Sequence, residues 1–140
     1  MKTTNSKLIN EIYPSLMAFS QLKSTLKGSY ACARSLKKIE EPISVYNSEK
    51  KKIIEQDCLK NEDGTPKTTP ILDDNRKETN FIKYNYESIE KEKEVVLKLN
   101  ELDNMEIELD LFQVNISDVE GTKELTGQIV LQLMDVFIKE

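Results

Sequence analysis

Hydrophobic residues recur every three or four positions along the first part of the chain. From Ser6 to Lys27 this stripe comprises Leu8, Ile9, Ile12, Leu16, Phe19, Leu22 and Leu26. The spacing predicts an amphipathic helix. Pro14 interrupts the stripe, and because proline disfavours helix in the residue before it, we expect one helix to end near Ile12 and a second to begin at Pro14. Gly28 then predicts a break or sharp turn.

A second stripe begins after Gly28. Its members are Tyr30, Ala33, Leu36, Ile39, Ile43, Tyr46, Ile53 and Ile54. The phase continues across Pro42, which predicts either one long helix kinked there or two nearly collinear helices. Two amphipathic helices bury their stripes against each other, so we expect residues 1–59 to form an antiparallel helical hairpin.

The next twenty residues, 60–79, are polar. Asp63-Gly64 and Thr65-Pro66 are typical of turns. We therefore expect a surface loop here, with room for a short hairpin.

In residues 80–140 the hydrophobic spacing switches between the two-residue period of strands and the three-to-four-residue spacing of helices. Phe81 to Tyr86 predicts a strand, and Ser88 to Asn100 predicts a helix whose apolar residues are Ile89, Val96 and Leu99. Met105 to Asn115 has the two-residue period of a strand with one face in water, its apolar positions being Met105, Ile107, Leu109 and Leu111.

The end of the chain predicts one more helix. Ser117 to Glu120 fits a capping box, and Gly121 moves the expected start to near Thr122. The helix would carry Leu125, Ile129, Leu133, Met134 and Phe137. The predicted fold class is α+β in a single domain, with an N-terminal helical hairpin followed by a small antiparallel sheet with two further helices.

Composition adds a polarised charge to this picture. The 140 residues, 38% of them hydrophobic, suffice for one domain with a modest core. Residues 1–60 hold eleven basic and six acidic side chains (+5), and residues 61–140 hold nine and nineteen (−10), which gives the net −5. Such asymmetry can steer a protein onto a charged partner, including another copy of itself, or can simply reflect ordinary solvated faces.

The residue types exclude several reaction classes. The chain has no histidine, so Ser-His-Asp and Cys-His arrangements cannot form and the commonest metal ligand is missing. Neither a P-loop nor GxGxxG occurs among the four glycines. We therefore expect a protein that is not an enzyme and has no cofactor and no metal.

Three carboxylates form the first candidate site. Glu106, Glu108 and Asp110 share one face of the predicted strand, with about 6.6 Å between successive members. The row could be a solvated strand face, or it could imitate nucleic-acid phosphates and bind a basic groove. It could also contribute to a cation site or lie beside a glycosidic bond.

Basic residues around Gly28 form the second candidate site, together with Tyr30. They are Lys23, Lys27, Arg34, Lys37 and Lys38. A basic turn with an aromatic residue can contact nucleic-acid phosphates or an acidic protein, and it can equally be an exposed helix face.

Cysteine usage and hydropathy indicate a location. Cys32 and Cys58 lack CxxC spacing, no signal peptide is visible, and the longest apolar runs are a few residues. These features predict a protein of a reducing cytoplasm with no membrane association.

The chain resembles a family of small uncharacterised proteins of phages and prophages of Gram-positive bacteria. The resemblance rests on the run from Leu26 to Glu40, the Tyr46–Glu55 helix, the turn from Asn61 to Pro66 and the segment from Leu97 to Leu111. Residues 67–87 depart from the family pattern. The resemblance implies a phage origin and the bacterial host cytoplasm as the location.

Three functional hypotheses follow for a protein that binds another macromolecule. The chain could inhibit a bacterial anti-phage defence system, such as a CRISPR nuclease, by direct protein binding. It could be a phage assembly or replication accessory that binds another phage protein. It could also bind nucleic acid through the basic helical hairpin, although the acidic net charge favours a protein partner.

Overall fold

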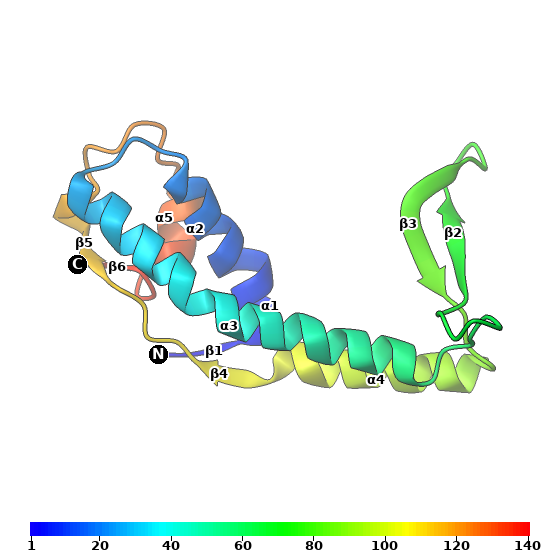
Figure 1. Ribbon diagram of the computed structural model, residues 1–140. Helices are drawn as coiled ribbons and strands as arrows, with labels where there is room; N and C mark the ends of the chain where they lie inside the picture. Colours follow the sequence, from blue (N-terminus) through cyan, green and yellow to red (C-terminus); the bar gives the residue numbers. More distant parts are fainter. The chain divides into compact units, whose positions relative to one another are not determined.

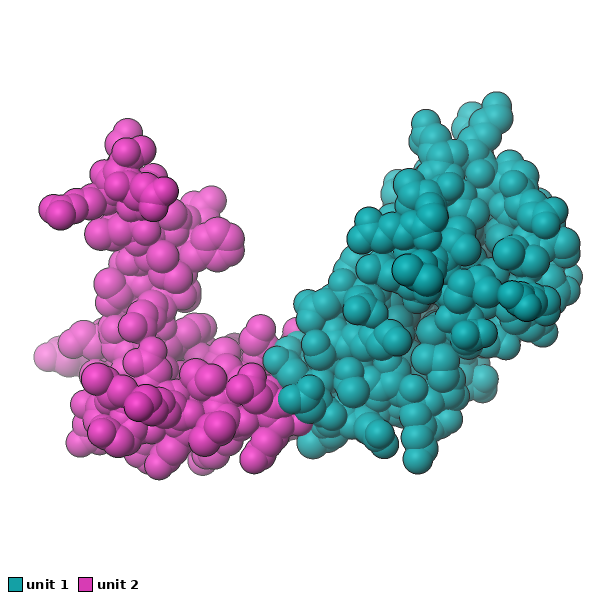
Figure 2. All heavy atoms as spheres, turned by 180° about the vertical axis from the view of Figure 1, so that it is seen from behind, with its two compact units in different colours: residues 1–46, 103–140 teal, residues 47–102 magenta.

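The computed structural model describes residues 1–140 and combines helices with short strands, as the α+β class predicts (Figure 1). Two compact units are present: unit 1 comprises residues 1–46 and 103–140, and unit 2 comprises residues 47–102 (Figure 2). The sequence predicted one domain. No helix combines the length and apolar character that a membrane crossing requires.

The elements follow one another in this order: β1 (Lys2–Thr4), α1 (Asn5–Lys7), η1 (Leu8–Ile12), α2 (Tyr13–Ser20), α3 (Leu26–Gln56), β2 (Thr68–Leu72), β3 (Glu78–Tyr84), α4 (Ile89–Asn104), β4 (Glu106–Glu108), β5 (Val114–Asn115), η2 (Ile116–Asp118), α5 (Gly127–Leu133) and β6 (Ile138–Lys139). The strands pair as three separate two-stranded sheets instead of one. β1–β4 and β2–β3 are antiparallel, and β5–β6 is parallel.

The first helical segment is continuous through Pro14. The Tyr13 N–H bonds to the Leu8 carbonyl, so η1 is a π-helical turn that leads directly into α2. A π turn widens the helix, and Pro14 lies in the first turn of α2, where a missing N–H is tolerated. The predicted end near Ile12 is therefore wrong.

The break falls earlier than the sequence predicted. α2 ends at Ser20, and Gly28 lies inside α3, where the Thr25 hydroxyl accepts its N–H at 3.0 Å as a helix cap. A Cβ at position 28 would lie 2.6 Å from the Ser24 Oγ. Gly28 thus serves close packing instead of a turn, and Leu26 is exposed.

α3 is a single helix with Pro42 inside it, which matches the first of the two predicted alternatives. Its buried stripe comprises Gly28, Ala31, Cys32, Ser35, Ile39 and Tyr46. Tyr30 and Ala33 belong to the predicted stripe but are exposed. The buried face of the helix is shifted from the predicted stripe by about one residue. The hairpin prediction holds in part: the Cys32 thiol donates to the Leu16 carbonyl, but α2 also packs against α5.

Unit 1 contains the hydrophobic core. Its fully buried large side chains are Leu8, Ile12, Leu16, Phe19, Ile39, Val114, Val119, Leu133, Phe137 and Ile138. Phe19 and Phe137 meet edge to face, with ring centroids 5.4 Å apart. Residues from both ends of the chain therefore close one core.

The predicted strand from Met105 to Asn115 is shorter in the structure. β4 stops at Glu108, although Leu109 and Leu111 keep the predicted alternation and are buried. At Phe112 the backbone of this segment bonds to the Ser35 side chain of α3. Phe112 donates its N–H to Ser35 Oγ at 3.1 Å, and Ser35 Oγ is 3.3 Å from the Phe112 carbonyl.

The last helix starts later than predicted. Glu124 has a φ of 64°, which a helix cannot contain, and Thr126 caps α5 by accepting the N–H of Ile129 at 3.3 Å. The capping box lies on η2, where Asn115 and Asp118 form it in place of the predicted Ser117–Glu120. Phe137 lies beyond the end of α5.

Unit 2 consists of the C-terminal part of α3, most of α4 and the β2–β3 hairpin. The segment from 60 to 79, predicted as a surface loop with room for a short hairpin, contains β2 and is mostly exposed. Three backbone hydrogen bonds form a closed ring at its base. The N–H of Leu59 donates to the Asn85 carbonyl, the N–H of Asn85 to the Lys67 carbonyl, and the N–H of Lys67 to the Leu59 carbonyl. The Tyr86 hydroxyl also donates to the Ile54 carbonyl at 2.8 Å.

Candidate binding surface

The acidic row predicted from the sequence is exposed but largely paired with cations. Glu108 lies 2.8 Å from the Met1 amino group and opposite Lys2 across the β1–β4 pair. Asp110 lies 3.6 Å from the Lys38 ammonium. Of the three carboxylates, Glu106 is the one without an ion pair.

The five basic candidates divide into those with partners and those without. Lys27 lies 3.2 Å from Asp118, and Lys38 also donates to the Asp110 carbonyl at 2.7 Å. Lys23 and Lys37 form no ion pair.

Phe112 lies beneath two of these cations. The Arg34 guanidinium carbon is 4.8 Å and the Lys38 ammonium 4.5 Å from the centre of its ring. Both distances are within the range of cation–π attraction. The structure therefore brings the basic and acidic sets together at Lys38 and Asp110. Many of the charged groups in both sets form ion pairs or cation–π contacts within unit 1.

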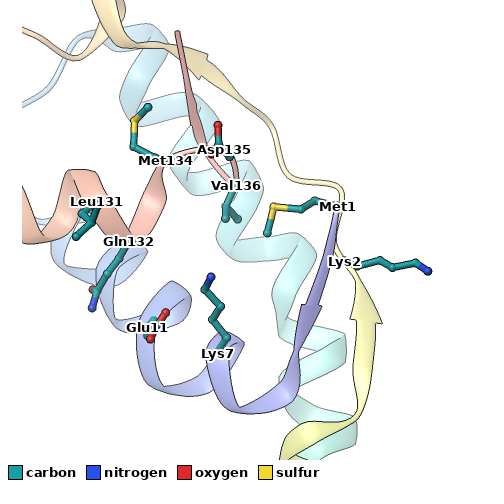
Figure 3. Close-up of a pocket in the computed structure, with 9 residues that line it drawn as sticks. All are labelled: Met1, Lys2, Lys7, Glu11, Leu131, Gln132, Met134, Asp135 and Val136. Carbon is teal, nitrogen blue, oxygen red and sulfur yellow. The ribbon is translucent and has the colours of Figure 1, made fainter.

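A pocket of about 560 Å³ opens on unit 1 (Figure 3). Lys7 and Glu11 come from one helical face and Gln132 from α5; the other lining residues are Met1, Lys2, Leu131, Met134, Asp135 and Val136. The buried Ser15 hydroxyl donates to the Gln132 side chain. This mixture of opposite charges and aliphatic groups contains no thiol and no aromatic ring, and no group of His, Cys, Asp and Glu residues in the structure could hold a metal ion.

Three other titratable groups serve the fold: Tyr46 and Cys32 are buried and Tyr86 is half-buried. Burial raises the pKa of Tyr46 to about 12, and its hydroxyl adds to the shift by donating to the Asp103 carboxylate at 2.6 Å. Burial also raises the pKa of the Cys32 thiol to about 11, and that of Tyr86 above its ordinary value. None of the three lines the unit 1 pocket.

Unit 2 is rich in uncovered apolar side chains for its size. Among residues 47–102 only Cys58, Val95 and Leu102 are buried. Eight large apolar side chains are exposed there: Leu59, Ile71, Leu72, Phe81, Ile82, Ile89, Val96 and Leu97. A unit that exposes more large apolar side chains than it buries has little core of its own.

The outer face of α4, defined as Ile89, Glu92, Lys93, Val96 and Leu97, lines a groove of about 510 Å³. Ile89 is 68% and Leu97 63% exposed. Val95, Leu99 and Leu102 lie on a different face of the helix and are buried or half-buried. α4 therefore has two apolar faces, of which one is covered.

The β2–β3 hairpin is uncovered on both of its faces. Phe81 is 73% exposed and its neighbour Ile82 is 50% exposed. Consecutive strand residues point to opposite faces, so each face of the hairpin presents an apolar side chain from β3.

The sequence did not identify the outer face of α4 as a site, because Ile89 and Val96 were predicted only as apolar residues of one helical stripe together with Leu99. The signal was nevertheless present. Val95, Val96, Leu97, Leu99 and Leu102 occupy more of the helix circumference than one buried stripe requires.

No protein family model, no curated protein and no solved structure matches the chain. Unit 2, which exposes more large apolar side chains than it buries, is the strongest candidate for a binding surface.

Proposed function

We propose that the chain is a non-enzymatic protein that binds another protein through unit 2. The observation that carries the proposal is that unit 2 buries three residues and exposes eight large apolar side chains. Contiguous exposed apolar surface rimmed by polar residues is typical of protein interaction sites. The outer face of α4 has this composition, since Glu92 and Lys93 border Ile89, Val96 and Leu97.

A protein partner fits this surface better than a nucleic acid does. Nucleic-acid binding needs a basic surface with free cations, whereas Lys27, Arg34 and Lys38 already contact groups within unit 1. The buried core of a protein interface is instead apolar and depleted of charged residues. The acidic row on unit 1 would then affect the rate of association more than the lifetime of the complex.

The resemblance to phage proteins favours an inhibitor that binds a component of a bacterial anti-phage defence system, such as a CRISPR nuclease. The alternative is a phage assembly or replication accessory that binds another phage protein. Both need a binding surface and no reaction chemistry.

A plaque assay with matched variants tests the proposal. Bacteria with a nuclease-based immunity would express the wild-type chain, Leu97→Glu or Leu131→Glu. Both leucines are exposed, Leu97 on unit 2 and Leu131 on unit 1 beside the pocket, so neither charge should disturb folding.

We expect the wild-type chain and Leu131→Glu to restore phage growth and Leu97→Glu to lose this effect. Equal loss with both variants would contradict a site on unit 2. If the wild-type chain restores growth against no nuclease system, the defence hypothesis is discarded. Co-purification with a phage-encoded protein, lost in Leu97→Glu, would then support the accessory hypothesis.

A further inference from the structure

The outer face of α4 has acidic residues on both of its borders. Consecutive helix residues point about 100° apart, and by this rule Glu92 borders the face on the side of Val96. On the side of Leu97, three exposed glutamates fall within about 40° of one another: Glu90, Glu94 and Glu101. Acidic side chains therefore flank the apolar groove along its length.

The lysines of α4 do not cancel this acidity. Lys93 is the one lysine that lines the groove. Lys91 and Lys98 point from the other side of the helix, where Lys91 lies 3.6 Å from Glu94 and Lys98 lies 4.0 Å from Asp57. The borders of the outer face thus carry more carboxylates than α4 can pair.

Two of these glutamates keep their charge available to a partner. Glu90 and Glu101 take part in no ion pair, whereas Glu92 lies 3.5 Å from the Lys83 ammonium. At 1.5 Å per residue, Glu90 and Glu101 are about 16 Å apart along the helix. A nucleic acid or the α4 of a second copy would bring negative charge to this surface, so charge favours an occupant that carries cations.

We propose that the outer face of α4 binds an amphipathic helix of the partner protein, one whose apolar stripe is flanked by lysine or arginine. The inference rests on the proposed function and specifies the chemistry of the partner. The backbone groups of α4 are bonded within the helix, so side chains must make the contact, and helices pack by fitting the ridges of one into the grooves of the other.

The residues of the face divide the work of binding between them. Ile89, Val96 and Leu97 would contact the apolar stripe of the partner helix, as in other grooves that accept amphipathic helices. Glu90 and Glu101 would pair with its cations at the exposed rim, where charges mainly set specificity and the rate of association.

Synthetic peptides of about 18 residues, long enough to cover the face, test this chemistry by fluorescence anisotropy with the purified chain. Two of them share leucines at three- and four-residue spacing, with lysine beside the stripe in one and glutamate in the other. We expect the lysine peptide to bind at least about tenfold more tightly at low salt, because several exposed charge pairs act together. A scrambled lysine peptide, which has no apolar stripe, should bind at least about tenfold more weakly than the ordered one.

Charge reversal places the peptide on α4. Glu90→Lys combined with Glu101→Lys should reverse the preference in favour of the glutamate peptide. The matched control is Glu120→Lys with Glu140→Lys, at exposed positions of unit 1. Each replacement adds two positive charges, so both double variants move from a net charge of −5 to −1. The control should keep the preference for the lysine peptide.

Four outcomes overturn the inference. They are equal affinity for the lysine and glutamate peptides, equal affinity for the ordered and scrambled lysine peptides, a lysine preference that both double variants change equally, and no binding at about 1 mM. Each of them leaves protein binding through unit 2 standing, because the plaque assay with Leu97→Glu tests that function without assuming the charge or shape of the partner.

Discussion

Val95 and Val96 are consecutive on α4, yet Val95 is 4% exposed and Val96 is 50% exposed. Consecutive helix residues point about 100° apart, so the two valines report on two faces of one helix. The face of Val95 is covered, whereas the face of Val96 forms the groove with Ile89 and Leu97. This difference separates the side chains that hold unit 2 together from those available to a partner.

The two valines allow a direct comparison of stability. Val95→Ala should lower the free energy of unfolding by about 2 kcal/mol, because it removes buried methyl groups and leaves a cavity. Val96→Ala should change it by less than about 0.5 kcal/mol, as is usual for exposed positions. Chemical denaturation monitored by circular dichroism measures both. Equal costs for the two variants would mean that the outer face of α4 is part of a core.

Ser35 carries a second prediction, because it is fully buried and its hydroxyl contacts both backbone groups of Phe112. Ser35→Ala would leave the N–H and carbonyl of Phe112 without this partner, at a cost of about 1–3 kcal/mol in the free energy of unfolding. Ser29→Ala, at an exposed position of the same helix, is the matched control and should be nearly neutral. A Ser35→Ala variant as stable as the wild-type chain would show that water or a rearranged strand replaces the hydroxyl.

Tyr46 makes the stability of unit 1 depend on alkaline pH. Its pKa is raised from 10.0 to about 12, chiefly by burial, so folding favours the neutral phenol. The resulting stabilisation is complete below pH 10 and is lost as the pH rises through about 12. The difference in unfolding free energy between the wild-type chain and Tyr46→Phe, measured across this range, should shift against the wild-type chain as the pH rises.

All other side chains are common to both proteins, so their contributions cancel in that difference. Tyr30→Phe, which removes the hydroxyl of an exposed tyrosine, is the matched control. A flat difference for Tyr46→Phe would contradict the raised pKa.

Cys32 should resist alkylation in the folded chain. The thiolate is the reactive form, and burial raises the pKa of this thiol to about 11, while its Sγ lies 3.4 Å from the Leu16 carbonyl. Mass spectrometry of iodoacetamide-treated protein should find Cys32 labelled far more slowly in buffer than in denaturant. Equal rates would indicate that α2 and α3 separate readily.

Periodicity predicted much of the fold, since it depends on local pattern. The long helix through Pro42, the helix containing Val95 and the burial of Leu109 and Leu111 all follow from it. Helix ends were less predictable, because they depend on contacts with distant residues. Gly28 is inside a helix that the Thr25 hydroxyl caps, and a Cβ at position 28 would meet Ser24. The last helix is delayed by the left-handed backbone at Glu124.

The candidate site was harder to predict than the fold. Sequence alone could not show that Lys38 pairs with Asp110, 72 residues away, and that the two charged sets therefore meet. Nor could it show which apolar face of α4 is covered, since both faces have helical spacing. Local pattern indicates which residues are apolar, and only the packing of α4 decides which of them remain exposed.

Hydrogen exchange of the free chain and of its complex with a captured partner tests the central claim most directly. Amides of residues 68–84 and 89–97 should gain protection in the complex, and amides of residues 23–38 and 106–110 should be unchanged. Protection confined to the acidic row and the basic residues of unit 1, with unit 2 exchanging as it does in the free chain, would contradict the account.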